Sequence, residues 1–268
     1  MRFQRFRGGA GTGRRRDAVI VYHAIGRVSR DAPEWNGFVS PERFAEQIAY
    51  LREHRRVVDL DALLARDGDT RRPRVAITFD DGYRSVLEEA VPMLEKNGLP
   101  ATFFVPTKWI GAWNGWNPDR ERLELMREDE LVGLARRGFA VECHGHAHLD
   151  YGRVGEEEAR ADVQASVERL AALLGRPPRY LAYPYGTATP AAAARAEELG
   201  LRAAFTLDRP EAVAGDFALR RVSIVPADRR PLFALKSSGR YIGWRQSHPV
   251  RTVYRTVRPL LRNRWVWP

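Results

Sequence analysis

The feature that most constrains the fold of this chain is a repeated alternation of short apolar runs with longer amphipathic ones. Six short runs are apolar almost throughout, which is typical of strands covered on both faces. These predicted strands are residues 18–22, 75–79, 101–105, 139–143, 180–183 and 203–206. The predicted helices between them are residues 41–54, 84–97, 128–137, 155–174 and 190–199. Repeated strand–helix units over about 200 residues predict an α/β fold with a parallel sheet, open or closed into a barrel.

The positive charge of the chain is concentrated at its two ends. Residues 1–16 contain six arginines and residues 239–268 contain seven, with no acid in either segment. Of the overall net charge of +10, this leaves −3 on residues 17–238. We therefore expect a basic N-terminal arm at 1–16, a single folded body at 17–238 and a basic, aromatic C-terminal tail at 239–268. The arm is rich in glycine and poor in apolar residues, so we expect it to be disordered.

The basic ends also bear on partners and location. An enzyme acting on nucleic acid is expected to carry positive charge around its cleft, so no nucleic-acid partner is predicted. Apolar residues recur at helical spacing over 250–261, with arginines on another face. This pattern suits either a segment lying on an anionic membrane surface or a helix packed on the body. No apolar signal-peptide stretch follows Met1, so a cytoplasmic location is expected, with peripheral attachment at the inner membrane face if the tail binds lipid.

Two adjacent acids, Asp80 and Asp81, directly follow the predicted strand at 75–79. Reactive groups gather at the carboxyl ends of strands in parallel α/β folds. Neighbouring acids at such an end point in different directions, so one can bind a cation while the other handles protons. The alternative is an ordinary turn, because Asp-Gly is a common turn dipeptide.

Three of the six histidines, His144, His146 and His148, follow the predicted strand at 139–143. His144 and His148 are four residues apart and can face the same way if the chain makes a helical turn. A single histidine at such a place would be explained by packing, whereas three favour a metal site. Because Cys143 is the only cysteine, the site must be built from histidines and carboxylates.

One aspartate and two histidines form a three-ligand set that leaves a coordination position open, as in catalytic rather than structural zinc sites. Such a site accepts Zn²⁺, Co²⁺, Ni²⁺ or Fe²⁺. A metal-bound water with a free carboxylate beside it indicates hydrolysis of an amide or an ester. Residues 183–186 (YPYG) follow another predicted strand and form either a rigid turn facing the substrate or a plain strand-to-loop turn.

The order and spacing of these clusters resemble the polysaccharide deacetylase (carbohydrate esterase) superfamily, in particular its exopolysaccharide-type branch. Residues 78–82 (TFDDG) match the first motif of that family, and residues 138–148 match the second. Residues 21–25 (VYHAI) and 38–44 (FVSPERF) are also similar. The resemblance covers about residues 19–233 and implies a distorted (β/α)7 barrel, with the body as the catalytic domain.

The resemblance also implies roles for individual residues. Asp80 would be the general base. Asp81, His144 and His148 would bind the metal, most often Zn²⁺ in this kind of site. The backbone N–H of Tyr185 would help stabilise the oxyanion.

The chain departs from the family pattern at several positions. Ala182 stands where many members have the arginine that orients the base, and Arg221 is our candidate to replace it. The usual late histidine, which protonates the leaving amine, has no counterpart, so His23 or His146 would serve, or the base itself. Glu142 stands where a small residue is usual and is expected to hydrogen-bond to a ligand histidine.

These observations predict a metal-dependent hydrolase that removes N-acetyl groups from an amino-sugar-containing polysaccharide or a lipid-linked glycan precursor. The alternatives are an O-acetyl esterase on the same scaffold and a catalytically degenerate glycan-binding protein. The loop at 109–120 carries Trp109, Trp113 and Trp116. It is either a platform on which a sugar stacks or a packed surface lid.

Overall fold

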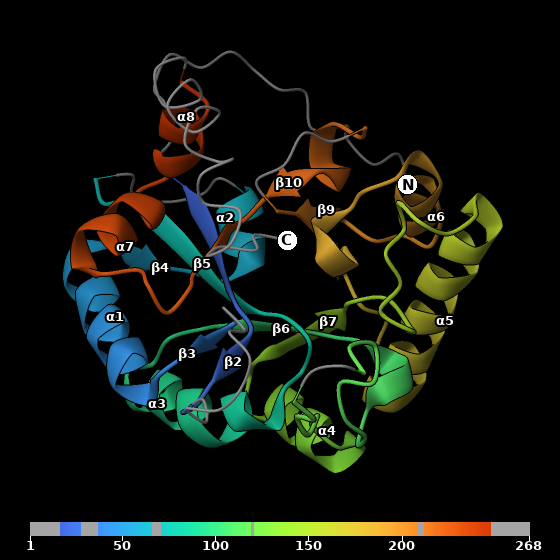
Figure 1. The fold of residues 1–268 in the computed structure, drawn as a ribbon, viewed down its shortest axis with the longest axis horizontal. Helices are drawn as coiled ribbons and strands as arrows, with labels where there is room; N and C mark the ends of the chain where they lie inside the picture. The colour runs from blue at the N-terminus through green and yellow to red at the C-terminus, as the bar shows by residue number, and fades with distance from the viewer. Residues whose placement is uncertain (1–16, 28–36, 66–70, 119–120, 208–211, 248–268) are drawn as a thin grey trace.

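The computed structural model is shown as a ribbon in Figure 1. It describes residues 17–27, 37–65, 71–118, 121–207 and 212–247. The basic arm at 1–16 and the amphipathic stretch at 250–261 lie outside the described residues.

The centre of the molecule is a parallel sheet that curls round until its two ends lie near each other. Its main strands are β1 (Ala18–Tyr22), β5 (Arg74–Phe79), β6 (Thr102–Val105), β7 (Ala140–Cys143), β8 (Tyr180–Ala182) and β9 (Ala203–Thr206). β10 (Leu219–Arg220) pairs with β9 at one end of the sheet, and β11 (Val222–Ser223) pairs with β1 at the other. Because only Arg221 separates β10 from β11, the sheet forms a nearly closed barrel. The predicted fold class is confirmed.

Helices surround this barrel, as the ring of coils in Figure 1 shows. They are α1 (Pro41–His54), α3 (Val91–Lys96), α4 (Glu128–Arg136), α5 (Glu156–Leu174), α6 (Pro190–Glu198), α7 (Arg230–Lys236) and α8 (Tyr241–Arg245). Ser40 caps α1 by accepting a hydrogen bond from the Arg43 N–H, with Pro41 at the first helical position. The helix predicted at 84–97 is present over 84–96, and its middle is a π-helical turn, Val86–Ala90, which leads into α3.

Several short elements were not predicted. β2 (Ala24–Ile25) pairs with β3 (Phe38–Val39), and β4 (Arg56–Val57) pairs with the start of β5. Single-turn helices lie at Thr107–Trp109, Pro184–Gly186 and Gly215–Phe217. Among the described residues, no helix is both long enough and apolar enough to span a membrane.

The apolar residues form two cores because successive strand residues face opposite sides of the sheet. Residues such as Ile20, Ile77 and Phe103 pack between the strands and the helices. Their neighbours in the chain face the barrel interior, where Phe104 and Phe205 lie. The short helix α2 (Leu60–Ala65) contributes Leu60 and Leu63 to this interior core. It therefore plugs the end of the barrel at which the strands begin and leaves the opposite end for the site.

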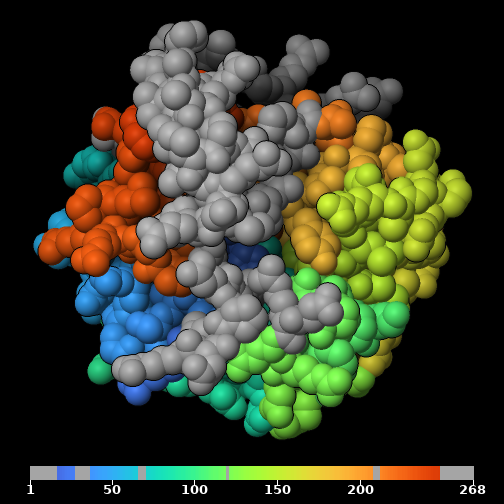
Figure 2. Space-filling view, viewed as in Figure 1, coloured from blue at the N-terminus to red at the C-terminus, as the bar shows by residue number. Residues whose placement is uncertain are grey.

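Chain segments that are far apart in sequence meet on the outer surface. In the space-filling view of Figure 2, α1 (blue) and α7 (orange-red) lie side by side. Arg55, which follows α1, donates hydrogen bonds to the carbonyl oxygens of Ala234 and Ser237 at the end of α7. The C-terminal part of the described chain is thereby attached to the first helix of the body.

Candidate active site

Asp80 extends the inward-facing side of β5. Ala76 and Thr78 face the barrel interior, so the next residue of that parity, Asp80, points inward where the strand ends. Arg221, at the seam between β10 and β11, reaches across the interior to this carboxylate. Its two terminal nitrogens each lie 2.6 Å from a different Asp80 oxygen, so the two side chains form a bidentate ion pair. The Arg221 side chain is 0% exposed and that of Asp80 is 3% exposed. A third contact, of 3.3 Å, joins Arg221 Nη1 to the Thr78 hydroxyl.

The electrostatics of this pair keep Asp80 ionised. Burial by itself raises the pKa of a carboxyl group, and it is the largest influence on Asp80. The charge of Arg221 and its hydrogen bonds act in the opposite direction and, with a smaller contribution from His144, prevail. The pKa of Asp80 is therefore below its usual value. Asp80 is therefore a negatively charged carboxylate, held in a fixed position inside the barrel mouth, that can accept a proton.

Asp81 lies next to two imidazole rings. Its Oδ1 is 3.2 Å from His144 Nε2 and 3.1 Å from His148 Nε2, and all three side chains are buried. The three ligand atoms lie within 4.8 Å of one another. Donors about 2.1 Å from a tetrahedral ion would be roughly 3.4 Å apart, close to the two measured separations. The donor set therefore fits a divalent cation in both chemistry and spacing.

The orientation of His144 also fits metal binding. Its Nδ1 lies 2.8 Å from the Ala182 carbonyl oxygen, which can only accept a hydrogen bond. Nδ1 therefore carries the proton, and Nε2, which faces Asp81, is the nitrogen available to a metal. Burial raises the pKa of Asp81, but the influence of the two histidines beside it outweighs burial and holds that pKa well below the usual range. The carboxylate is thus charged and available as a ligand.

Backbone strain is concentrated at this site. Among the described residues, the non-glycine residues with positive φ are Asp81 (70°), His148 (60°) and Tyr185 (57°). Left-handed backbone is costly for such residues and persists where the surrounding structure enforces it, which is common at functional sites. Tyr185 lies with its ring centroid 4.8 Å from that of His148, so all three strained residues lie at the site.

The two candidate proton donors lie in different surroundings. His23 directly follows β1 and, behind the larger influences of burial and hydrogen bonding, its charge lowers the pKa of Asp81. It also lowers that of Asp80, so His23 lies close enough to act electrostatically on both acids. His146 instead has its Nδ1 2.8 Å from the Thr107 hydroxyl. Of the two, His23 is the one that the structure brings to the acids.

The expectation for Glu142 was wrong. It shares the inward face of β7 with the position of His144 but lies two residues earlier, about 7 Å deeper in the barrel. Its Oε2 accepts hydrogen bonds from the backbone N–H groups of Arg179 (2.6 Å) and Tyr180 (3.1 Å). The ligand histidine His144 is oriented by a backbone carbonyl instead.

Sequence reasoning missed Asp162 on α5. Its carboxylate accepts hydrogen bonds from the backbone N–H groups of His146 (2.8 Å) and Ala147 (2.7 Å) and from the Tyr151 hydroxyl (2.8 Å). It thereby anchors the segment that carries both ligand histidines. The available signal was an acid within the apolar stripe of a helix, one residue before the buried Val163.

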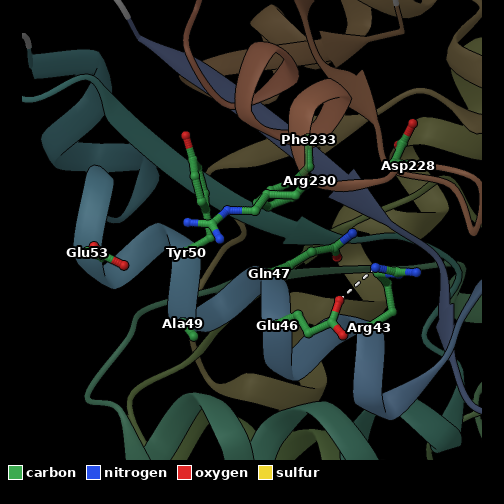
Figure 3. Close-up of a pocket in the computed structure, with 9 residues that line it drawn as sticks. All are labelled: Arg43, Glu46, Gln47, Ala49, Tyr50, Glu53, Asp228, Arg230 and Phe233. Atoms are coloured by element: carbon green, nitrogen blue, oxygen red, sulfur yellow. Dashed lines mark hydrogen bonds and ion pairs between the residues drawn. The ribbon is translucent and has the colours of Figure 1, made fainter.

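A pocket of about 310 Å³ lies elsewhere, between α1 and α7 on the outside of the barrel (Figure 3). Its lining includes Gln47, Tyr50, Arg230 and Phe233. None of the residues proposed for the site lines it. The converging acids and histidines at the barrel mouth therefore mark the candidate active site, and this pocket does not.

Comparison with known sequences identifies the family to which this chain belongs. The polysaccharide deacetylase family matches residues 67–204, which is half of the chain. The poly-beta-1,6-N-acetyl-D-glucosamine N-deacetylase of Staphylococcus aureus (strain MRSA252) is 26% identical over 203 residues, covering 70% of this chain and 68% of that protein. YxkH of Bacillus subtilis (strain 168) is 26% identical over 167 residues, or 61% of this chain. The match spans 56% of the length of YxkH.

Solved structures share the fold. IcaB from Ammonifex degensii superimposes with a TM-score of 0.68 at 27% identity, covering 83% of this chain and 97% of that one. The Streptococcus pyogenes deacetylase PplD, in complex with acetate, gives a TM-score of 0.69 at 20% identity, covering 82% and 97%. At that lower identity the second likeness concerns the fold alone.

Proposed function

Since this chain belongs to the polysaccharide deacetylase family, we propose that it removes N-acetyl groups from amino sugars of a polysaccharide or a lipid-linked glycan precursor. The observation that carries the proposal is the buried set of Asp81, His144 and His148, with the ionised Asp80 beside it. His144 Nε2 is 3.9 Å from Asp80 Oδ2, so the base and the metal ligands border the same space. A degenerate glycan-binding protein would have no need to keep four such groups together.

Asp81, His144 and His148 would hold the metal, for which Zn²⁺ is our first choice. When bound, a divalent cation at this place lowers the pKa of water and polarises the amide carbonyl. Asp80, ionised and fixed by Arg221, accepts the proton of the water as its oxygen attacks the acetyl carbon. The backbone N–H of Tyr185 would stabilise the negative charge that develops on the carbonyl oxygen.

The leaving amine needs a proton when the C–N bond breaks. His23 is our candidate donor, because it is the histidine outside the ligand set whose charge acts on both Asp80 and Asp81. The bond to the acetyl carbon breaks, the nitrogen takes the proton, and acetate and a free amino sugar leave. The proton that Asp80 received replaces the one that His23 gave, so charge balances over the cycle.

The proposal is tested by measuring acetate release from N-acetylglucosamine oligomers, with β-1,6-linked chains first. The purified protein is loaded with Zn²⁺, Co²⁺ or Ni²⁺ in turn and compared with Asp80→Asn. We expect release from the loaded wild type and almost none from the variant. Equal release from both proteins would contradict the proposal, and release from O-acetylated sugars alone would favour an esterase.

We also propose that the protein works in the cytoplasm at the inner face of the membrane. α7 and α8 expose Leu232 (37%) and Trp244 (48%), and residues 229–247 contain basic side chains but no acid. An exposed apolar pair among arginines suits an anionic lipid surface. Co-sedimentation with phosphatidylglycerol vesicles, but not with phosphatidylcholine vesicles, is expected. Loss of binding in Trp244→Ala would support the surface, and unchanged binding would count against it.

A further inference from the structure

The two ligand histidines are supported in different ways. His144 donates its Nδ1 proton to the Ala182 carbonyl, the usual arrangement by which a metal-binding histidine is oriented. His148 Nδ1 is buried and has no hydrogen-bond partner on another of the described residues. On the side of the ring away from Asp81, no hydrogen bond to another described residue therefore fixes its orientation.

Aromatic rings surround His148 instead. The Trp116 ring stacks on it almost in parallel, with centroids 4.4 Å apart and planes at 17°. The Tyr185 ring meets it edge-on at 4.8 Å and 75°, and the His144 ring does so at 5.0 Å and 74°. One face of the imidazole is thus covered by an indole, which limits rotation of the ring about its bond to Cβ.

Trp116 is itself held by the segment that it covers. The Trp109 indole N–H donates to the Ala147 carbonyl oxygen at 3.1 Å, and the rings of Trp109 and Trp116 meet edge-on at 5.9 Å. Glycine at position 115 allows the backbone to lie this close to the Trp109 ring, because a Cβ at that position would be 2.2 Å from Trp109 Cζ3. The loop before α4 is thereby attached to the histidine segment at two points.

The backbone of His148 makes this support necessary. Its φ of 60° is costly for a side chain with a Cβ and persists only where neighbouring contacts fix it. Asp162 fixes the preceding N–H groups, at His146 and Ala147, but makes no recorded contact with the His148 ring. Apart from the 3.1 Å contact of its Nε2 with Asp81 Oδ1, the contacts of the ring described above are aromatic.

We infer that Trp116 is a positioning residue for the metal site, which orients the ligand His148 by stacking where a hydrogen bond would ordinarily do so. The inference rests on the proposed function, since it assigns a role toward the same metal. The loop that carries Trp116 thereby has a role in metal binding, in addition to the roles of sugar platform or lid considered above. It also predicts that loop changes which move Trp116 alter metal affinity.

The test is a titration of the metal-free protein with Co²⁺ alone, followed by visible absorption, which reports ligand geometry as well as affinity. Trp116→Ala is expected to weaken Co²⁺ binding about tenfold or more, within the range that partners of metal ligands contribute. It should also change the shape of the absorption band. Trp116→Phe, which restores an aromatic face, should recover most of the affinity.

Trp113→Ala is the matched control. Trp113 belongs to the same loop, and its ring centroid lies 4.4 Å from Arg122 Cζ and 6.5 Å from that of Trp109, but it does not stack on His148 as Trp116 does. Its removal should leave Co²⁺ affinity and the band unchanged. Unchanged binding in both alanine variants would overturn the role of Trp116 and leave the proposed function standing. A wild type that binds no Co²⁺ or Zn²⁺ would overturn both. Circular dichroism of each variant, with Trp116→Phe as the folded reference, excludes global unfolding as the cause.

Discussion

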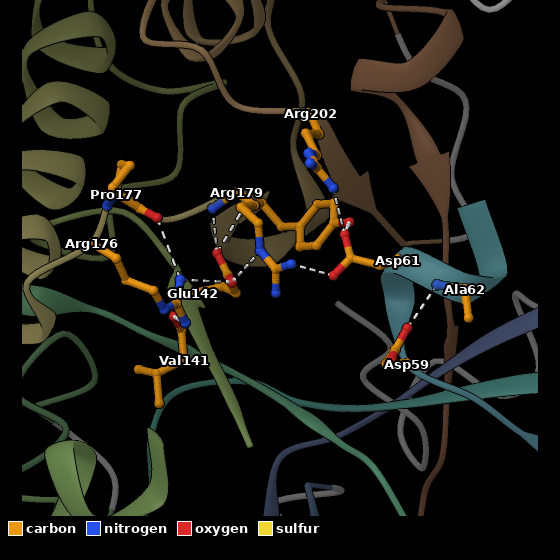
Figure 4. Close-up of polar contacts among 10 residues, drawn as sticks. Asp59, Asp61, Ala62, Val141, Glu142, Arg176, Pro177, Arg179 and Arg202 are labelled. Carbon is orange, nitrogen blue, oxygen red and sulfur yellow. Dashed lines mark hydrogen bonds and ion pairs between the residues drawn. The ribbon is translucent and has the colours of Figure 1, made fainter. Parts of the chain in front are cut away.

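Each end of the barrel carries a cluster of charged and polar side chains. The two clusters contain similar residue types but differ in whether their charges are balanced. At the end where the strands begin, Asp61 on α2 accepts hydrogen bonds from the Arg202 guanidinium (2.7 Å) and the Tyr180 hydroxyl (2.6 Å) and pairs with Arg179 (Figure 4). Glu142 accepts two backbone N–H groups at the same end. Each of these carboxylates has arginines beside it, so the cluster has no surplus negative charge.

At the other end, one arginine faces two buried acids. Arg221 neutralises Asp80 by a bidentate pair, whereas Asp81 has only imidazole neighbours. Asp81 is therefore a buried acid that no arginine or lysine among the described residues pairs with, which favours a cation there. The described non-glycine residues with positive φ, namely Asp81, His148 and Tyr185, lie at this end as well. The comparison indicates that charge imbalance and strain, rather than the number of polar groups, distinguish the reactive end from the structural one.

The largest effect should come from exchanging one carboxylate at each end for an amide. Asp80→Asn is expected to lower turnover by about 10³-fold, because the proton acceptor is lost while the metal ligands stay. Asp61→Asn should leave turnover within about twofold and lower the melting temperature instead, because it weakens contacts with Arg179, Arg202 and Tyr180. Initial rates of acetate release and thermal melts measure the two effects.

A loss of turnover in Asp61→Asn equal to that in Asp80→Asn would contradict the division between the two ends. Metal content of each variant, measured by elemental analysis, serves as the control. It should be unchanged in both.

The second prediction concerns Arg221 and pH. Replacement by methionine leaves Asp80 buried without its partner and is expected to cost about 3–5 kcal/mol of unfolding free energy at pH 7. In the wild type the pKa of folded Asp80 is lowered, so its contribution to stability is present above the unfolded pKa of about 3.9 and is lost as pH falls through the folded pKa. In Arg221→Met the folded pKa rises, so the acidic limb of the rate profile should move to higher pH.

Urea unfolding and pH–rate profiles test this prediction. Arg202→Met is the control at the other end, because Arg202 is largely exposed and its loss should cost about 1 kcal/mol or less. An acidic limb that stays in place in Arg221→Met would mean that Asp80 does not titrate in that limb.

The features predicted from sequence are those whose signal is local. The apolar run at 75–79 and the acids that follow it predict both a strand and its reactive end, because strand direction decides where Asp80 and Asp81 emerge. The same holds for His144 and His148 after β7. Their convergence then follows from the parallel sheet.

Other features depend on contacts between distant segments, which no local pattern encodes. Arg221 was a candidate because it follows a predicted strand and matches an arginine of the related family, but its place at the seam could not be predicted, because strands of two residues have no recognisable period. The position of α2 across the end of the barrel depends on a contact between Asp61 and Arg179, which are 118 residues apart in the sequence. The stacking of Trp116 on His148 requires knowledge of how the loop at 109–118 folds back.

The third prediction concerns removal of the metal. A cation that binds only the folded state stabilises it by about 2.7 kcal/mol at a concentration a hundred times its Kd. Chelation of the loaded protein should therefore lower the melting temperature by several degrees. Asp81→Asn should abolish this difference, whereas Asp61→Asn should keep it, because Asp61 lies at the end without surplus charge. Equal shifts in both variants would place the cation somewhere other than the barrel mouth.

The smallest effect is expected at Glu142. Burial raises the pKa of this carboxyl group despite its hydrogen bonds from Arg179 and Tyr180. A folded pKa above the unfolded value of about 4.3 means that its stabilising contribution is present below that value and is lost as pH rises through the folded pKa. Glu142→Gln does not titrate. Its unfolding free energy, relative to wild type, should therefore increase from pH 4 to pH 7, by about 1.4 kcal/mol for each unit of pKa difference. Turnover should not change, because Glu142 touches neither the base nor the metal ligands. A fall in acetate release would show that the two ends of the barrel are coupled through its interior.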